Sequence, residues 1–228
     1  MRRFLRSLST VLIVAGALLL TDAIVTLVWQ EPITAFTTQL EQDDLAEDLQ
    51  TLQAEPPSAL EVKALEGLRT TRRRVAFQGR ALDRKLQDGQ AAGRILIPKI
   101  GADFVVVKGS DPADLRKGPG LYDDTPFPGV PGTTAIAGHR TTYLAPFRHV
   151  DELRAGNTIV LEMPYATLTY SVQGTKIVEP QDLGVIARRS YDRLVLTACH
   201  PLFSAAQRIV VFARLIRTVP TGATARSR

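Results

Sequence analysis

The chain contains one cysteine, Cys199, at the end of an apolar run that starts at Leu194 and is stopped by Pro201. A lone cysteine cannot form an internal disulfide, so it is either a small buried apolar residue or a nucleophile. A free thiol titrates near about 8.5 and reacts slowly at neutral pH unless a base or a cation lies beside it. If Cys199 is catalytic, the rest of the sequence must supply such a group.

Among the three histidines, His139 is the best partner for the thiol. It follows an apolar segment at 134–137 and Gly138, and a strand end beside a loop is a common place for site residues. His149 is predicted to lie on the surface. His200 adjoins Cys199, and neighbours on a strand point to opposite faces, so His200 is a poor partner.

A basic residue follows the cysteine on the next apolar segment. Arg208 lies nine residues after Cys199, and a hairpin between the two segments would bring its guanidinium beside the thiol. Such a group could hold a peptide carbonyl or an oxyanion, although arginines that begin strands are also common surface charges. The cysteine and histidines lack the paired spacing of zinc ligands. We therefore expect no metal site and no cofactor.

The elements that must position these residues are short strands. The sequence predicts strands at 95–97, 104–107, 134–137, 158–162, 167–172, 194–197 and 209–216, and short helices at 112–116 and 146–153. Many short strands separated by glycine and proline indicate a mainly β domain, a small barrel or sandwich, over residues 93–217. Residues 218–228 are expected to be a flexible tail.

The start of the chain predicts a membrane anchor over residues 1–30. Three arginines (Arg2, Arg3 and Arg6) precede an apolar stretch at 8–29 in which Asp22 is the single charge. A helix needs about 20 such residues to cross a bilayer, and the leading arginines predict a single-pass protein with its N-terminus in the cytoplasm. A signal peptide cleaved after Ala23 is the alternative. Either interpretation places the folded domain outside the cell.

Residues 31–92 are expected to form a stalk, partly helical or disordered. The stalk carries an acidic cluster at 41–48 and then a basic run at 69–85. The basic run is interpreted as a solvated helix face, the alternative being attraction to an anionic membrane or cell-wall polymer. No aromatic residues interleave it, and the net charge is only +5, so nucleic acid is not an expected partner.

The combination of motifs closely resembles a sortase, and within that family class E of high-GC Gram-positive bacteria. The matching pieces are a signal anchor, Gly-His-Arg-Thr-Thr-Tyr at 138–143, Leu-Thr-Ala-Cys-His-Pro at 196–201 and Gln-Arg-Ile-Val-Val-Phe-Ala at 207–213, together with 97–101 and 118–120. The resemblance implies an eight-stranded β-barrel and a cysteine transpeptidase. It implies that Cys199 attacks the Thr–Gly bond of a sorting signal, that His139 protonates the leaving amine and that Arg208 holds the substrate and the oxyanion.

Further expectations follow from this resemblance. The thioacyl intermediate would be taken by an amine of a peptidoglycan precursor or a pilin, and class E members favour Leu-Ala-x-Thr-Gly over Leu-Pro-x-Thr-Gly. Tyr143 matches a position implicated in that choice, and Thr197 and Ala198 are expected to contact the substrate. The chain departs from the family at Leu144, where glycine is expected, at Ala198, often threonine, and at Leu121, more usually histidine.

Two other classes of protein are considered. The first is a membrane-anchored adhesion or scaffold domain whose Cys199 is merely buried. Such a domain has no need of His139 or Arg208. The second is an L,D-transpeptidase, but Thr-Ala-Cys-His does not match the Ser-x-Gly-Cys-Arg pattern of those enzymes.

Overall fold

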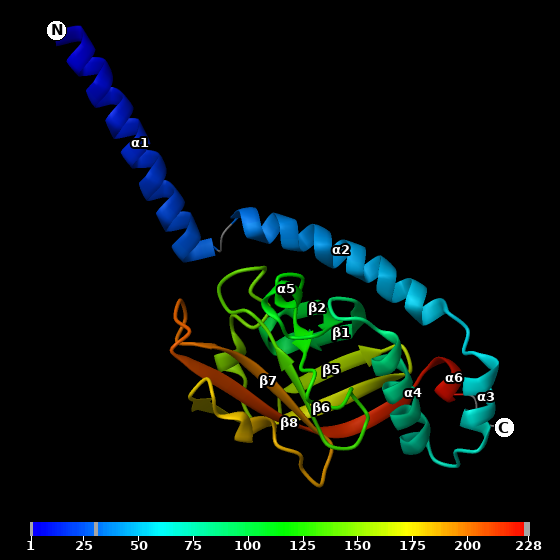
Figure 1. Cartoon of the computed structure of the whole chain (residues 1–228). Helices are drawn as coiled ribbons and strands as arrows, with labels where there is room; N and C mark the ends of the chain where they lie inside the picture. The colour runs from blue at the N-terminus through cyan, green and yellow to red at the C-terminus, as the bar shows by residue number, and fades with distance from the viewer. Residues whose placement is uncertain (1, 30–31, 226–228) are drawn as a thin grey trace.

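The computed structural model describes residues 2–29 and 32–225. Its β-sheet closes on itself as an eight-stranded barrel in the order β1-β2-β3-β4-β7-β8-β6-β5 (Figure 1). The strands are β1 (Ala91–Ile97), β2 (Ala102–Lys108), β3 (Gly120–Leu121), β4 (Thr133–Ala137), β5 (Thr158–Met163), β6 (Ala166–Val178), β7 (Arg193–His200) and β8 (Gln207–Pro220). The eight-stranded barrel with short helices is thus confirmed.

The helices lie outside the barrel. They are α1 (Arg2–Trp29), α2 (Pro32–Ala54), α3 (Ala59–Glu66), α4 (Thr71–Lys85), α5 (Pro112–Leu115) and α6 (Gly222–Ala225), with 3-10 turns η1 (Pro98–Ile100), η2 (Val150–Glu152) and η3 (Leu183–Ile186). Figure 1 shows α1 projecting away from the folded body, α2 lying along one side of the barrel, and α3, α4 and α6 grouped at another side.

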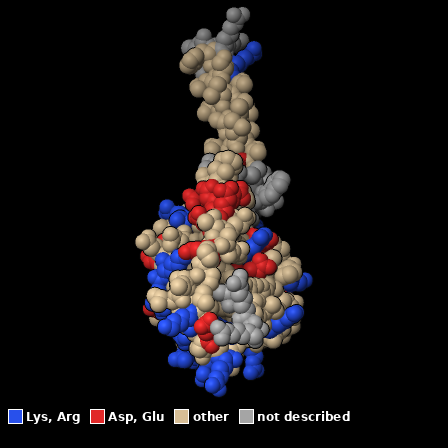
Figure 2. All heavy atoms as spheres, turned by 90° about the vertical axis from the view of Figure 1, so that its right-hand side faces the viewer, with Lys and Arg blue, Asp and Glu red and all other residues tan. Residues whose placement is uncertain are grey.

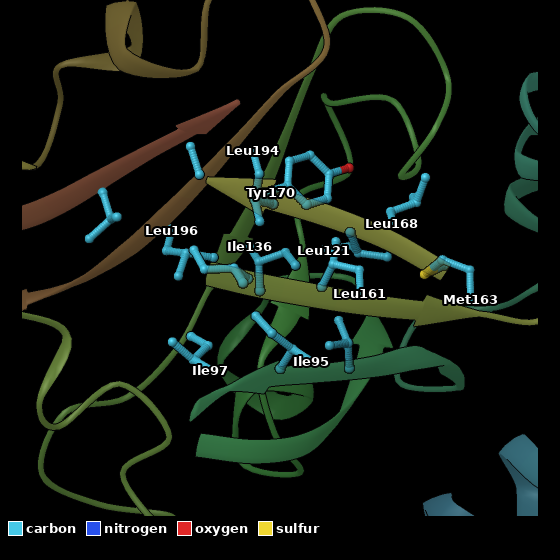
Figure 3. Packing of buried hydrophobic residues seen from close by; sticks show 14 of the residues in the cluster. Ile95, Ile97, Leu121, Ile136, Leu161, Met163, Leu168, Tyr170, Leu194 and Leu196 are labelled. Atoms are coloured by element: carbon cyan, nitrogen blue, oxygen red, sulfur yellow. The ribbon is translucent and has the colours of Figure 1, made fainter. Parts of the chain in front are cut away.

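The barrel interior is filled by apolar side chains that alternate along the strands. On β6, Leu168, Tyr170 and Val172 are buried while the residues between them are partly exposed, as period-two patterning predicts. Figure 3 shows the labelled side chains converging from strands on all sides of the barrel. Each large apolar side chain fully buried in this way contributes about 1.5–3 kcal/mol.

The region expected to be a stalk is largely helical, and its helices pack against the barrel. Leu45 and Leu49 of α2 are buried in a cluster with residues of β1 and β2. Val75 and Leu82 of α4 belong to the main core. Through these apolar positions α2 and α4 belong to the folded body rather than to a free-standing segment.

Gln42 of α2 completes the hydrogen bonding of β2. Its side chain accepts from the Val105 amide at 2.8 Å and donates to the Val105 carbonyl at 3.1 Å and to the Lys117 carbonyl at 2.7 Å. The ladder between β2 and β3 holds only Val107 and Lys108, so the amide of Gln42 stands where a longer β3 would have supplied a peptide group. A Cβ on Gly118 would lie 2.4 Å from Gln42 Nε2, so glycine is needed for this approach.

Helix α1 contains a segment long and apolar enough to cross a membrane, from Arg6 to Ala23, and none of that segment is buried. Other boundaries differ from those expected. β1 begins at Ala91, and β8 runs to Pro220 and is followed by α6, so most of residues 218–225 of the expected tail lie in regular structure. Residues 226–228 of that tail lie outside the described part of the chain. Only the short η2 forms where a helix was expected at 146–153. The division into anchor, stalk and catalytic domain remains a proposal.

Candidate active site

Cys199 and Arg208 are direct partners across the antiparallel pair β7–β8. Directly opposed residues share a face of the sheet. The alternate β7 residues Leu194, Leu196 and Ala198 belong to the barrel core, so Cys199 faces outward, and it is only partly buried. Arg208 is held by its own loop, since its Nη1 donates to the carbonyls of Ala205 at 2.9 Å and Gln207 at 3.0 Å.

His139 lies just beyond β4, at the same end of the barrel as Cys199. β4 and β7 are parallel, with Ala137 opposite Thr197, and the Gly138 amide donates to the Thr197 carbonyl at 3.1 Å. Continuing that register by two residues brings the chain at His139 level with Cys199. A Cβ on Gly138 would lie 2.5 Å from the ring of Phe147, so glycine is needed where the chain leaves the strand.

The environment of His139 disfavours its charged form. Burial, and then the positive charge of Arg116, lower the pKa of His139 below its ordinary value of 6.5. The ring of Tyr143 lies against it, with centroids 4.9 Å apart and planes tilted by 44°. The neutral imidazole therefore dominates near neutral pH.

Tyr143 lies in a left-handed turn. Tyr143, Leu144 and Ala145 have φ angles of 52°, 59° and 42°, a region that side chains other than glycine rarely adopt. Leu144, where the family resemblance predicts glycine, is thus in the conformation that glycine favours. The turn places Tyr143 against His139, so the two side chains occupy one wall of the site.

The two expected substrate contacts beside Cys199 differ in orientation. Thr197 faces outward, like Cys199, and its hydroxyl is 2.8 Å from the Tyr122 hydroxyl. Ala198 is 3% exposed and its side chain belongs to the barrel core. Alternation along β7 turns the Ala198 side chain inward, and the expected contact of Ala198 with substrate stays a prediction.

A buried arginine links the loop of His139 to the end of β7. Arg140 is 2% exposed, and its Nη2 donates to Asp151 Oδ1 at 2.8 Å and to the Arg148 carbonyl at 3.1 Å. Its Nη1 lies 3.4 Å from the Cys199 carbonyl and 3.4 Å from His200 Nδ1. Sequence reasoning assigned Arg140 no role, because these contacts depend on how the loops after β4 fold over the end of the barrel.

The remaining histidines have other partners. His149 is on the surface, as predicted, where its Nδ1 lies 2.9 Å from Glu152 Oε1. His200 contacts Arg140 rather than the thiol of its neighbour. Among the described residues, no group of three or more histidine, cysteine or acidic side chains could hold a metal ion.

Another cluster of apolar side chains lies on the outer face of the barrel sheet, the face that also carries Cys199. We call it the outer apolar cluster. Its buried members lie on β4, β6, β7 and β8 and are Ala135, Val178, Val195 and Val210. Four partly buried residues pack against them: Tyr122, Val185, Ile186 and Phe212. The buried members are at most 7% exposed. A peptide bound here would therefore contact the partly exposed side chains that cover them, which are Tyr122, Val185, Ile186 and Phe212.

The fold and this arrangement define a closed β-barrel with a partly buried cysteine on its outer face, opposite an arginine. A family model described as Sortase domain matches residues 95–216, which is more than half of the chain. The chain therefore belongs to the sortase family, as predicted from its motifs.

Particular relatives agree with this assignment. Sortase D of Bacillus subtilis is 35% identical over 136 residues, 58% of this chain and 67% of that protein. Sortase SrtE2 of Streptomyces coelicolor is 30% identical over 155 residues, 58% of this chain and 61% of that protein. The structure of sortase E from Streptomyces avermitilis, 31% identical, superimposes with a TM-score of 0.55 over 62% of this chain and 100% of that chain. Family and fold together support a cysteine transpeptidase role.

Proposed function

We propose that this protein cleaves a C-terminal sorting signal between threonine and glycine and transfers the acyl part to an amine. The observation that carries the proposal is the pairing of Cys199 with Arg208 on the outer face of the barrel, level with the strand end that bears His139. A nucleophile, an anion-binding cation and an acid–base group in one place are what acyl transfer requires.

In the proposed first step, the Cys199 thiolate attacks the threonine carbonyl carbon and Arg208 stabilises the negative charge that forms on its oxygen. The carbon–nitrogen bond then breaks, and protonated His139 gives its proton to the leaving glycine amine. A thioester and a neutral imidazole remain. In the second step an acceptor amine attacks the thioester, His139 takes the amine's proton, and the carbon–sulfur bond breaks to restore the thiolate.

The outer apolar cluster is the proposed binding surface for the signal. A leucine four residues ahead of the scissile bond would contact this cluster, and Thr197 and Tyr143 would lie beside the reacting residues. Preference for Leu-Ala-x-Thr-Gly and membership of class E stay predictions, since the relatives Sortase D and Sortase SrtE2 are 35% and 30% identical to the chain. The acceptor, a peptidoglycan precursor or a pilin amine, is likewise proposed.

The proposed location is the cell membrane, with α1 as a single-pass anchor, the N-terminus in the cytoplasm and the barrel outside. The support is the length and apolar character of Arg6–Ala23 and the leading arginines. Secreted proteins that carry a sorting signal would then meet the thiol after they cross the membrane.

The test is peptide cleavage by the purified protein with quenched Leu-Ala-x-Thr-Gly and Leu-Pro-x-Thr-Gly peptides and an added amine. We expect cleavage between threonine and glycine, an amide product with the amine, and no product from Cys199→Ala. If neither peptide is cleaved, the proposed substrate is wrong. A thiol-selective alkylating reagent separates the enzyme from a scaffold: labelling of Cys199 only after denaturation would favour the scaffold.

A further inference from the structure

The outward row of β7 that carries Cys199 leads to a positively charged hollow. Arg193, Val195, Thr197 and Cys199 alternate with residues of the barrel core, so all four share the outer face. At the start of β7 lies an open hollow of about 720 Å³, bordered by β6, β8 and the loop between β6 and β7. Arg193 is part of its lining.

Arg193 is a buried cation without a carboxylate partner. It is 5% exposed, and its Nη2 donates to the carbonyls of Val185 at 2.6 Å and Ala187 at 3.0 Å. Its guanidinium carbon lies 5.1 Å from the centre of the Phe212 ring, and its Nε has no hydrogen-bond partner among the described residues. Arg140, which is as deeply buried, has Asp151 as its counter-ion.

The surroundings of Arg193 add positive charge. Arg189 and Lys176 line the same hollow, and Arg214 is the direct cross-strand partner of Arg193. Burial, and then the charge of Arg189, lower the pKa of Arg193, although Tyr191 opposes this. The acidic residue at the hollow is Asp182, which lies 3.9 Å from Lys176.

The positive charges around Arg193 favour the binding of an anion that is not part of the chain. Like charges placed opposite each other on a sheet destabilise it, and a buried cation without a counter-ion is costly. A carboxylate in the hollow would accept from the arginines and relieve both effects. Such a ligand would enter from the solvent side of the hollow, where Arg189 and Lys176 are exposed.

We propose that the hollow binds an acidic side chain of the substrate, about two residues ahead of the leucine of the sorting signal. Six residues of β7 separate Arg193 from Cys199, which is roughly 20 Å of extended chain. The four signal residues on the acyl side of the scissile bond cover roughly 13 Å of that distance and lie over the outer apolar cluster. This inference rests on the proposed function, because it uses Cys199 as the point of cleavage.

The experiment compares two quenched peptides that differ only in two residues ahead of the leucine, Glu-Glu or Gln-Gln. We expect kcat/KM to be about tenfold higher for the Glu-Glu peptide, an effect in KM that shrinks with added salt. Arg189→Gln should reduce this preference and Arg193→Met should abolish it. Arg188→Gln removes an exposed cation outside the hollow and should leave the preference unchanged.

Thermal unfolding checks that the Arg193→Met protein is folded. Arg189→Gln alters an exposed side chain, so the peptide comparison can be decided with this variant even if Arg193→Met does not fold.

Equal kcat/KM for the two peptides would overturn the carboxylate site while leaving the proposed function intact. Binding of both peptides to the Cys199→Ala protein gives an answer without catalysis. If neither peptide is cleaved but Glu-Glu binds in an Arg193-dependent way, the reaction is wrong and the site stands. If inorganic phosphate binds at Arg193 and the Glu-Glu peptide does not, the site belongs to a phosphate-bearing ligand and the proposal fails.

Discussion

The acid–base behaviour of His139 is set by its neighbours. Since burial and Arg116 lower its pKa, the protonated form that would donate to the leaving amine is a minor one at neutral pH. The same shift affects stability. The folded state binds fewer protons than the unfolded state when pH falls through 6.5, so stability is complete above that pH and declines below it toward the lower, folded-state value.

Replacing Arg116 tests the electrostatic part of this shift. Arg116→Met should raise the pKa of His139 toward 6.5, incompletely, because burial is the larger cause. The measurement is an NMR titration of the imidazole protons, assigned with His139→Gln. Arg84→Met, which removes an exposed cation of α4, is the control and should leave the midpoint where it is. An unchanged midpoint in Arg116→Met would contradict the assigned cause.

Substitution of Arg140 tests whether activity depends on the buried hydrogen bonds that this side chain makes. In Arg140→Lys the charge is kept but the fork that reaches Asp151, the Arg148 carbonyl and the Cys199 carbonyl is lost. We expect kcat to fall by about ten- to a hundredfold with little change in KM, because geometry at Cys199 changes while the peptide surface does not. Peptide cleavage kinetics and thermal unfolding measure this.

The control for Arg140 is Arg154→Lys, an exposed arginine bonded to the carbonyls of Asp151 and Leu153. This variant should keep the wild-type kcat. An Arg140→Lys protein that folds and keeps full kcat would show that the network serves stability alone.

Among the elements, α2 supplies β2 with hydrogen-bond partners that the two-residue β3 does not provide. Gln42→Met should destabilise the protein by about 1–3 kcal/mol, because the buried amide and carbonyl of Val105 lose their side-chain partners. Chemical denaturation measures the change. Gln39→Met on the same helix removes an exposed bond to Asp43 and should stay within about 0.5 kcal/mol of wild type. Equal effects of the two variants would contradict the role given to Gln42.

Local pattern predicted most of the strands, and topology explains what it missed. Part of β6 could be predicted from the sequence because Leu168, Tyr170 and Val172 alternate with polar residues. β3 has two residues, Gly120 and Leu121, which is too short for any period. Its place depends on the close approach of Gly120 to the Gly109 carbonyl, a tertiary contact that no periodic pattern reveals. The packing of α2 was missed for the same reason.

The residues of the site also fall into those that the sequence predicted and those that it did not. Cys199 and Arg208 could be paired from sequence because consecutive strands joined by a short loop are usually neighbours. The inward orientation of Ala198 was available from alternation along β7. The partnership of Arg140 with Asp151 was not, since it depends on how two loops fold over the barrel end.

For the whole molecule, charge is distributed unevenly along the long axis. Figure 2 shows acidic side chains gathered directly beneath α1 and basic ones at the far end of the body. The acidic residues of α2 are Glu41, Asp43, Asp44, Glu47 and Asp48. With α1 in a membrane, this basic end would point away from the bilayer and be free for solvent or an anionic wall polymer.

Two truncations test how the N-terminal helices contribute. Removing residues 1–31 should change the Tm by less than about 2 °C, because the apolar segment of α1 is not buried, and should leave peptide cleavage intact while the protein loses its membrane fraction. Removing residues 1–58 should lower the Tm strongly, because Leu45, Leu49 and Gln42 leave with α2. Thermal unfolding of both proteins and of the full chain decides; equal Tm values for the two truncations would contradict the packing role of α2.

The short connection between α1 and α2 determines how far the thiol can travel. Only residues 30 and 31 separate the two helices, and two residues span at most about 7 Å. The Thr38 hydroxyl of α2 donates to the Arg116 carbonyl, and Arg116 acts on His139, so the site lies toward the start of α2. If α1 spans the membrane as proposed, a barrel anchored this closely would reach only a thin layer at the bilayer surface. Substrates that are still held by an apolar tail in the same membrane would then meet the thiol at a high effective concentration, and this lateral encounter would favour them over soluble peptides of identical sequence.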